Sequence, residues 1–576
     1  MPGMFGAIEC DRDLCHRLKE KFTAPWGACS TLELKNGILG GHAFNGSQVL
    51  HSLDENAHFV VDGERSIYQI TTAPFKLSPT FELSSSCKGN VGIATNDLWY
   101  LATDWAGSFP LYYAPTSEGF LFCSRLRPLA EIIRPQVDIV GIRQFLHEAY
   151  MLSGRTFYKG ISRLMPGQVL TYDPSNHRVS IAESSKAWVG LECNSVSMTW
   201  NKLTDAVSQS MDMFGSNAIM MSAGWDSRTL LAAAQDRLPS KHIVAYCHGR
   251  PDCLEVRLAK EICDALAITF HNEPLRLTTS DLENLRVGFD RSETVVFPEW
   301  HRAGQVLASL GIDAVASGVL GEILGGHYSR TMLFTGPRKT LSFLMQMLGL
   351  NSSFSSIIDA LRIEHLVKPW YVCPEFWGDV DQLITTMNVD VDNTFKRYTD
   401  RGIQSADQLV EAFITEHRGV QYITSQLLSC RAYLDVSIPF AERNLYVLAS
   451  RIPLSVKFHN ALNRDLLRKY SPKLLQFRTA AAPVPASMPI LVQEISRLIR
   501  HTAEKRANMP TIAWYDWEFL RNDKVLYDIV DDLKADLWNM EAIRQRIEEL
   551  HKNELEPVGR LFQRLLIMYT VDLMLR

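Results

Sequence analysis

The chain has 576 residues, a formal net charge of −5 and 46% hydrophobic residues, a composition typical of a globular protein of two to four domains. Without a basic surplus, nucleic acid is not expected as a partner. No apolar run reaches the roughly 20 residues that cross a bilayer, and residues 1–13 lack a secretory pattern, so we expect no membrane association. The 11 cysteines contain no Cys-x-x-Cys pair, which predicts reduced thiols in a cytoplasmic protein.

Residues 1–185 predict an antiparallel, β-rich domain. Short apolar runs separated by turns recur through this part, for example at 59–61, 91–94 and 120–122. Helices are few, and the clearest is expected over residues 140–151. A break in the pattern follows at residues 184–197.

Residues 198–500 predict a second domain built around a parallel sheet. Helical stretches alternate here with buried strands, which are expected at residues 217–221, 243–247, 267–270 and 312–316. Beyond about residue 340 the pattern is mostly helical. Residues 501–576 predict a helical C-terminal extension, with a long charged helical tail over residues 514–576.

The segment after the first of these strands indicates a phosphate site. Ser222, Gly224 and Ser227 allow the backbone to approach a ligand, and the N–H groups of the following helix favour an anion. Without a cation, the Asp226 carboxylate would repel a phosphate, but a divalent cation could bridge the two groups. The turn therefore predicts a nucleotide pyrophosphate site with a built-in metal ligand. An ordinary helix cap is the alternative interpretation of the same residues.

A second turn of similar character follows the strand at 312–316. It contains Ser317 and Gly318, then the acidic residue Glu322, then a glycine pair. Loops that follow strands of an open parallel sheet lie at the same edge, where ligands bind. We therefore expect Asp226 and Glu322 to meet around one cation.

These segments resemble those of the asparagine synthetase family. Ser222-Ala223-Gly224-Trp225-Asp226-Ser227 resembles its Ser-Gly-Gly-Leu-Asp-Ser pyrophosphate loop, and residues 317–328 look like its Ser-Gly-Glu-Gly-x-Asp-Glu-x-Phe-Gly-Gly-Tyr loop. Residues 438–443 are similar to its Val-Pro-Phe-Leu-Asp-Arg segment, and residues 462–468 stand where it has a Lys-x-Leu-Leu-Arg helix. The match runs in order over most of residues 1–500.

The resemblance implies an N-terminal amidotransferase-like domain of the N-terminal-nucleophile hydrolase fold, followed by a PP-loop ATP pyrophosphatase domain. It implies ATP and Mg²⁺ as cofactors, with Asp226 and Glu322 as the metal ligands and Arg464 as a catalytic cation. The residues implied to bind ATP and pyrophosphate are Met220, Ser222, Ala223, Gly224, Trp225, Asp226, Ser227, Tyr246, Ser317 and Gly318.

The N-terminal domain departs from the family at its nucleophile. The amidotransferase members begin Met-Cys-Gly-Ile-x-Gly, whereas this chain begins Met1-Pro2-Gly3-Met4-Phe5-Gly6. Proline has no thiol and cannot form a thioester. Asp62-Gly63-Glu64 still resembles the family's Asn-Gly-Glu oxyanion segment, but the segments that hold glutamine have no counterpart. We therefore expect this domain to be structural and inactive as a glutaminase.

The synthetase half also departs from active members. Val319 stands where they carry Glu, Tyr or His, and valine cannot act as a base toward the attacking amine. His327 and Tyr328 are weak candidates for a replacement base, and each is more typical of a structural residue. Arg464 replaces a lysine, which keeps the positive charge but changes its geometry.

Three further basic residues are candidates for phosphate contacts. Arg228 lies in the helix after the first turn, and Lys457 and Lys469 flank the segment that contains Arg464. For all three a solvated surface position is the favoured interpretation.

The leading functional hypothesis is an ATP-dependent, AMP-forming amide-bond ligase that does not use glutamine. β-Lactam synthetases and lasso-peptide cyclases are relatives that also lack the cysteine. Asparagine synthesis is one alternative, and a non-catalytic relative that binds nucleotide or a partner is another. We expect small-molecule or peptide carboxylates and amines as substrates, and a homodimer is compatible with the sequence. The identity of the acyl and amine substrates stays open.

Overall fold

The protein is described from a computed structural model. The structure describes residues 2–44, 47–52, 57–65, 67, 88–183, 195–239, 242–273, 277–278, 281–334, 336–348, 350, 353–493, 495–497, 499, 515, 517–552 and 558–576. The break expected at residues 184–197 therefore lies mostly outside the described residues. Among the described residues, no helix combines the length and apolarity needed to cross a bilayer.

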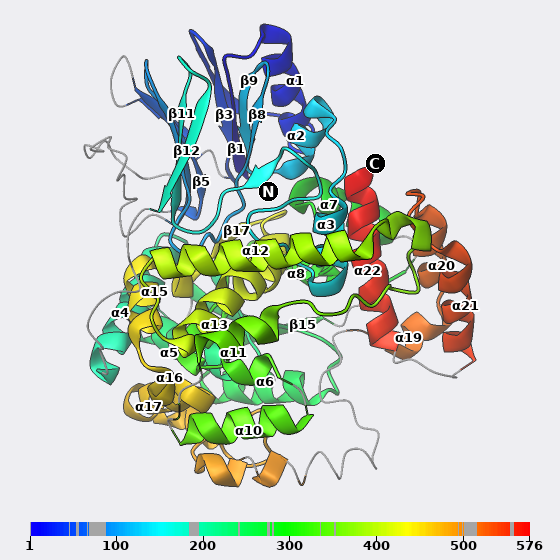
Figure 1. The fold of residues 1–576 in the computed structure, drawn as a ribbon. Helices are drawn as coiled ribbons and strands as arrows, with labels where there is room; N and C mark the ends of the chain where they lie inside the picture. The colour runs from blue at the N-terminus through cyan, green and yellow to red at the C-terminus, as the bar shows by residue number, and fades with distance from the viewer. Residues whose placement is uncertain are drawn as a thin grey trace.

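The N-terminal part contains two six-stranded antiparallel sheets stacked face to face (Figure 1). Their strands are β1 (Gly3–Ile8), β2 (Ser30–Leu34), β3 (Gly37–His42), β4 (Leu50–Ser52), β5 (His58–Gly63), β6 (Gly89–Ala94), β7 (Trp99–Ala102), β8 (Tyr112–Thr116), β9 (Gly119–Cys123), β10 (Ser162–Arg163), β11 (Gln168–Asp173) and β12 (Arg178–Glu183). The strand orders are β10-β8-β9-β1-β3-β2 and β12-β11-β7-β6-β5-β4. Phe120 of the first sheet stacks on Tyr172 of the second, with ring centroids 4.8 Å apart, in the core between them. The predicted antiparallel, β-rich architecture is confirmed.

Helices cover the outer face of the first sheet. Helix α1 (Arg12–Thr23) buries Leu14, Leu18 and Phe22, and α2 (Leu126–Ile133) joins the same core. The spacing of four residues between these apolar side chains is a helical signal that the sequence analysis did not use. The helix expected at 140–151 is α3 (Ile139–Glu148).

The second half is organised around a five-stranded parallel sheet. Its strands are β13 (Asn217–Met220), β14 (Ile243–His248), β15 (Thr269–Glu273), β16 (Ala314–Ser317) and β17 (Asp435–Ser437), in the order β15-β14-β13-β16-β17. The first four strands lie where the sequence predicts them, whereas the three-residue β17 was not foreseen. Strands β14 and β15 lie on one side of β13, and β16 and β17 lie on the other. Where the strand order reverses in this way, open α/β sheets bind ligands in a crevice beyond the carboxyl ends of the strands, here β13 and β16.

Helices surround this sheet and form one core with it. Those nearest to it are α4 (Val196–Met211), α5 (Trp225–Arg237), α6 (Leu254–Ala265), α7 (Asp281–Ser292), α8 (Pro298–Ser309), α9 (Glu322–Gly325), the π-helix η6 (Thr415–Ile423), α14 (Thr424–Cys430), α15 (Arg443–Arg451), α16 (Leu454–Lys457) and α17 (Ala461–Tyr470). Farther out lie α10 (Gly336–Met347), α11 (Phe354–Leu361), α12 (Val380–Asp400) and α13 (Ala406–Ile414).

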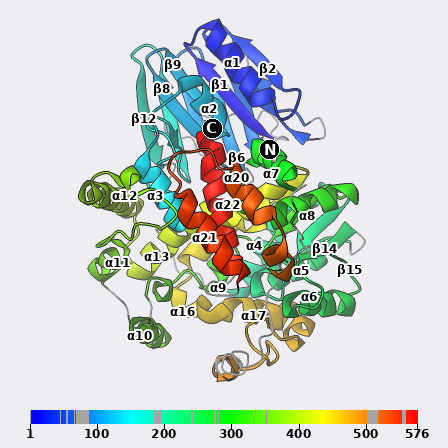
Figure 2. The same cartoon turned by 90° about the vertical axis from the view of Figure 1, so that its right-hand side faces the viewer.

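The C-terminal extension is helical, as the sequence predicts, and its described residues are divided among four helices. It contains α19 (Trp517–Asn522), α20 (Val525–Asp532), α21 (Met540–His551) and α22 (Val558–Leu575). Helix α22 is largely buried, with Leu565 and Tyr569 at most 1% exposed. It runs alongside α3, below the N-terminal sheets (Figure 2). The extension therefore helps to join the two halves of the molecule.

Candidate active site

The turn between β13 and α5 is held by hydrogen bonds among its own serines. Ser222 Oγ lies 2.9 Å from Ser227 Oγ and accepts a hydrogen bond from Gly224 N at 3.1 Å. Gly224 is the N-cap of α5 and offers the helix no side-chain acceptor. The N–H groups of the first helical turn are therefore suited to an anion placed above the turn.

The turn after β16 lies directly against Asp226. A Cβ atom at Gly318 would be 3.0 Å from Asp226 Cβ, and one at Gly321 only 2.7 Å from it. These spacings leave no room for a side chain at either glycine. Leu320 between them has a φ of 64°, a left-handed conformation that leucine rarely adopts. The two turns therefore meet closely at the carboxyl ends of neighbouring strands.

A cavity of about 230 Å³ opens where the turns meet. Nine of the residues proposed to bind ATP or metal line it: Met220, Ser222, Gly224, Asp226, Ser227, Tyr246, Ser317, Gly318 and Glu322. Ala223, Trp225 and Arg464 are not in the lining. Val319, at the position of the missing base, does face the cavity.

The two carboxylates of this cavity influence each other's titration. Burial raises the pKa of Asp226 to about 7. Burial and the nearby Asp226 charge raise the pKa of Glu322 to about 7 as well. Among the described residues, Oε2 of Glu322 is buried without a hydrogen-bond partner. Two close, partly buried carboxylates form a site that favours a cation.

The carboxylate pair fits Mg²⁺ better than a metal with an all-protein ligand set. Within the described part of the chain, no three His, Cys, Asp or Glu residues gather in a group that could hold a metal. Mg²⁺ typically takes one or two carboxylates and completes its shell with water and substrate phosphates. The pair provides carboxylate oxygens, which are the ligands that this hard cation prefers.

A chain of side-chain amides connects the two turns through α17. Asn463 Nδ2 donates to Asp226 Oδ1 at 3.2 Å and to Asn460 Oδ1 at 3.1 Å. Asn460 Nδ2 in turn lies 2.9 Å from Nε2 of His327, the residue after the glycine pair. Asn463 is thus a site residue that the sequence analysis missed, although it lies beside the predicted Arg464.

The proposed catalytic cation, Arg464, and the base candidates, His327 and Tyr328, lie outside the lining of this cavity. Arg464 is half-buried, and its Nε has no hydrogen-bond partner among the described residues. Burial raises the pKa of the Tyr328 hydroxyl well above its ordinary value, which disfavours a role as base. His327 belongs to the amide chain described above.

Two of the three surface assignments were wrong. Arg228 is 0% exposed and donates to the carbonyl oxygens of Leu474 and Phe477 at 3.1 and 2.9 Å, so it holds the chain after α17 against α5. Lys457 is also 0% exposed and pairs with Glu411 at 2.6 Å. Lys469 is exposed, as predicted.

Further lining residues come from elements that carried no motif. His248 and Trp300 face the cavity from the end of β14 and from α8, with ring centroids 5.3 Å apart. Burial lowers the pKa of His248 to about 4, so its imidazole is neutral at physiological pH. Glu255, Ile423 and Gln426 complete this side. The position of His248 at a strand end was the available signal, as it was for Tyr246.

In the N-terminal part, the Asp-Gly-Glu segment forms interactions between the two halves of the molecule. Asp62 is fully buried and pairs with Arg431 at the end of α14, at 2.7 Å. Glu64 pairs with Lys88 at 2.8 Å and accepts a hydrogen bond from the backbone N of Ile438. These carboxylates therefore hold the sheets against the parallel-sheet half. Pro2, the residue directly before β1, is buried.

One protein-family model matches part of the chain. Residues 93–182 match the family model of a glutamine amidotransferase domain. The matched region begins after the segment that would contain the nucleophile. No curated protein matches the chain.

Two solved structures are similar in part. One is glutamine phosphoribosylpyrophosphate amidotransferase from B. subtilis complexed with ADP and GMP, at 11% identity over 55% of this chain and 81% of that chain, with a TM-score of 0.20. The other is described as the allosteric regulatory enzyme of purine biosynthesis, at 10% identity over 48% of this chain and 82% of that chain, with a TM-score of 0.22. Likeness at this level carries no argument about function.

Proposed function

We propose that the protein is an ATP-dependent, AMP-forming amide-bond ligase that activates a carboxylate without hydrolysing glutamine. The observation that carries this proposal is the convergence of two turns on Asp226 and Glu322 at the switch point of the parallel sheet. A partly buried pair of carboxylates beside an open helix N-terminus combines a cation site with an anion site. A magnesium–triphosphate is a ligand that satisfies both.

In this proposal the N–H groups at the start of α5 bind the pyrophosphate part of ATP, and Asp226 and Glu322 hold Mg²⁺. The metal would offset negative charge on the phosphates. Met220 and Tyr246 would border the adenine, and Trp300 of α8 and Ile423 of η6 line the same cavity. The substrate carboxylate attacks the α-phosphate and releases pyrophosphate, and an amine then attacks the acyl carbon and releases AMP. Positioning supplies most of the rate enhancement.

The N-terminal part is proposed to be structural. Its Asp62 and Glu64 are committed to buried contacts with the other half, and its second residue is proline. Nitrogen would therefore come from an amine substrate or ammonia, and purified protein should release no glutamate from glutamine.

A non-catalytic nucleotide-binding relative is the second candidate. Val319 faces the cavity where a base is expected, and Arg464 does not line it. Such a protein would bind magnesium nucleotide without turning it over.

One experiment separates the two candidates. Pyrophosphate release from ATP and Mg²⁺ is measured across a panel of carboxylic acids for the wild type and for Asp226→Asn, with binding of a non-hydrolysable ATP analogue measured in parallel. A ligase releases pyrophosphate with at least one acid and loses this activity in the variant. Binding of the analogue without turnover over a broad panel supports the non-catalytic candidate instead.

A further inference from the structure

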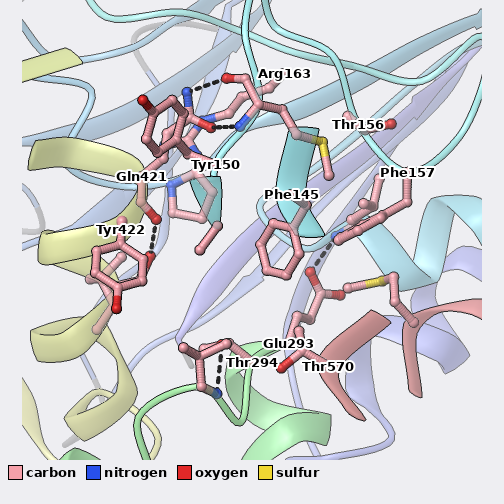
Figure 3. A pocket seen from close by; sticks show the side chains of 18 of the residues that line it. Phe145, Tyr150, Thr156, Phe157, Arg163, Glu293, Thr294, Gln421, Tyr422 and Thr570 are labelled. Atoms are coloured by element: carbon pink, nitrogen blue, oxygen red, sulfur yellow. Dashed lines mark hydrogen bonds between the residues drawn. The ribbon is translucent and has the colours of Figure 1, made fainter. Parts of the chain in front are cut away.

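A second cavity, of about 120 Å³, lies where the N-terminal part, the helical half and the C-terminal helix meet. Its walls come from the segment 149–157, from residues 292–297 before α8, from η6 and α14, and from Thr570 and Met574 of α22. The C-terminal extension therefore supplies part of its lining. Figure 3 shows side chains converging on it from all of these elements.

Much of this cavity wall is aromatic. The rings of Phe145, Tyr150, Phe157, Phe297 and Tyr422 face it. A cavity of about 150 Å³ is known to hold a benzene molecule, so this volume suits one small ring or a short hydrocarbon chain. Such walls recognise an apolar body by shape and provide no polar partner for it.

At another part of the wall stand two polar groups that make few contacts with other polar groups of the described residues. Within the described residues, the guanidinium of Arg163 forms no ion pair and donates one long hydrogen bond, of 3.5 Å, to the carbonyl oxygen of Gly107. Tyr112 is the cross-strand partner of Arg163, and its hydroxyl makes no hydrogen bond to any described residue. A guanidinium and a hydroxyl that face the same cavity together match a carboxylate.

The other charged residues of the lining already have partners. Arg155 pairs with Asp138 and with Asp390, each at 2.7 Å. Glu293 accepts hydrogen bonds from the backbone N of Leu126 and of Arg127 at the start of α2. Its negative charge is therefore used to cap that helix, and Arg163 is the lining cation left for a ligand.

We propose that this cavity binds a small monocarboxylate with an apolar body, whose carboxylate lies against Arg163 and Tyr112 and whose body lies among the aromatic rings. It shares no lining residue with the Asp226 cavity. The helix 415–430 separates them, with Gln421 and Ser425 on this side and Ile423 and Gln426 on the other. The bound acid is thus distinct from the carboxylate that would be activated, and the inference does not depend on the proposed function.

The test uses benzoate and benzamide, which have nearly the same shape but differ in charge. Binding of each to the full-length protein is measured by calorimetry without nucleotide. We expect benzoate to bind about tenfold more tightly than benzamide, Arg163→Gln to abolish this preference, and Tyr112→Phe to weaken benzoate about threefold. Arg178→Gln, at an exposed position of β12, is the matched control and should bind as the wild type does.

The Tyr112→Phe variant keeps the test informative if Arg163→Gln does not fold. Equal binding of the two compounds, no binding of benzoate, or benzoate binding that is unchanged in folded variants would each overturn the proposal.

Discussion

Asn463 of α17 donates a hydrogen bond of 3.2 Å to Oδ1 of Asp226 in the first turn of α5. The two residues are 237 positions apart in the sequence. This contact orients one of the two carboxylates that define the candidate site. It also lowers the pKa of Asp226, opposing the larger effect of burial. Asn463 is therefore a positioning residue for the carboxylate, and its removal should alter the pH at which the site binds a cation.

Replacing Asn463 with leucine should raise the pKa of Asp226 further, because the carboxylate loses the one side-chain donor that the described residues provide. Mg²⁺-dependent nucleotide binding should then require a higher pH, with its midpoint shifted upward by about half a unit to one unit. Calorimetric titrations between pH 6 and 9 measure the midpoint. Asn388→Leu, at a residue whose amide bonds to Ile363 far from the site, should leave it unchanged. A midpoint that does not move in Asn463→Leu would contradict this role.

The carboxylate pair should make stability depend on pH. With pKa values of about 7 for Asp226 and Glu322, the metal-free folded protein retains protons that the unfolded chain releases above about pH 4. Unfolding then becomes easier as pH rises from about 4 to 7. The Asp226→Asn variant should lose less stability over this pH range. At pH 8 without metal it should be more stable than the wild type by on the order of 2 kcal/mol.

Denaturant titrations at pH 5 and pH 8, with EDTA and with Mg²⁺, measure this effect. Mg²⁺ should stabilise the wild type at pH 8 and have little effect on the variant. Identical pH profiles of stability for the two proteins in EDTA would show that the pKa of Asp226 is not raised in the folded protein.

Gly321→Ala should damage the site while the fold persists. The added Cβ would come 2.7 Å from Asp226 Cβ, so the two turns must separate. We expect a loss of about 1–3 kcal/mol in unfolding free energy and at least a tenfold loss of Mg²⁺-nucleotide affinity. Gly215→Ala is the matched control, because its nearest neighbour would lie at 3.4 Å, an ordinary contact distance. Wild-type affinity in Gly321→Ala would mean that the turns need not touch.

Lys457 should be important for stability. It is 0% exposed and its partner Glu411 is also buried, so Lys457→Met leaves a carboxylate unpaired in the interior. The expected cost is about 3–5 kcal/mol of unfolding free energy. Lys469→Met, on the exposed surface, should cost less than about 0.5 kcal/mol. Chemical denaturation of the wild type and the two variants measures these free energies of unfolding. Similar stability of Lys457→Met and Lys469→Met would refute the importance of Lys457 for stability.

The sequence predicts the parts of this structure that depend on local patterns. The strand-turn-helix at 217–234 and the strand and turn at 314–322 are visible as buried runs followed by small residues, and sheet topology then brings them to one edge. Arg228 and Lys457 were misplaced because their partners, the carbonyl of Leu474 and the carboxylate of Glu411, lie far away in the sequence. No local pattern marks such a residue as buried.

The same limit explains the missed site residues and the second cavity. Asn463 was passed over in favour of Arg464, since one residue along a helix rotates the side chain by about 100° and only the packed structure decides which one faces Asp226. The cavity beside Arg163 is lined by several segments that are far apart in the chain, including α22, and no local pattern marks them as neighbours.

The central claim is that Asp226 and Glu322 hold one Mg²⁺ against a bound triphosphate. Calorimetric binding of a non-hydrolysable ATP analogue, with Mg²⁺ and with EDTA, tests it in the wild type, Asp226→Asn and Glu322→Gln. The account predicts that Mg²⁺ tightens binding at least about tenfold in the wild type and that either substitution removes this gain. Equal affinity in EDTA and Mg²⁺ for the wild type, or full metal dependence in both variants, would contradict it.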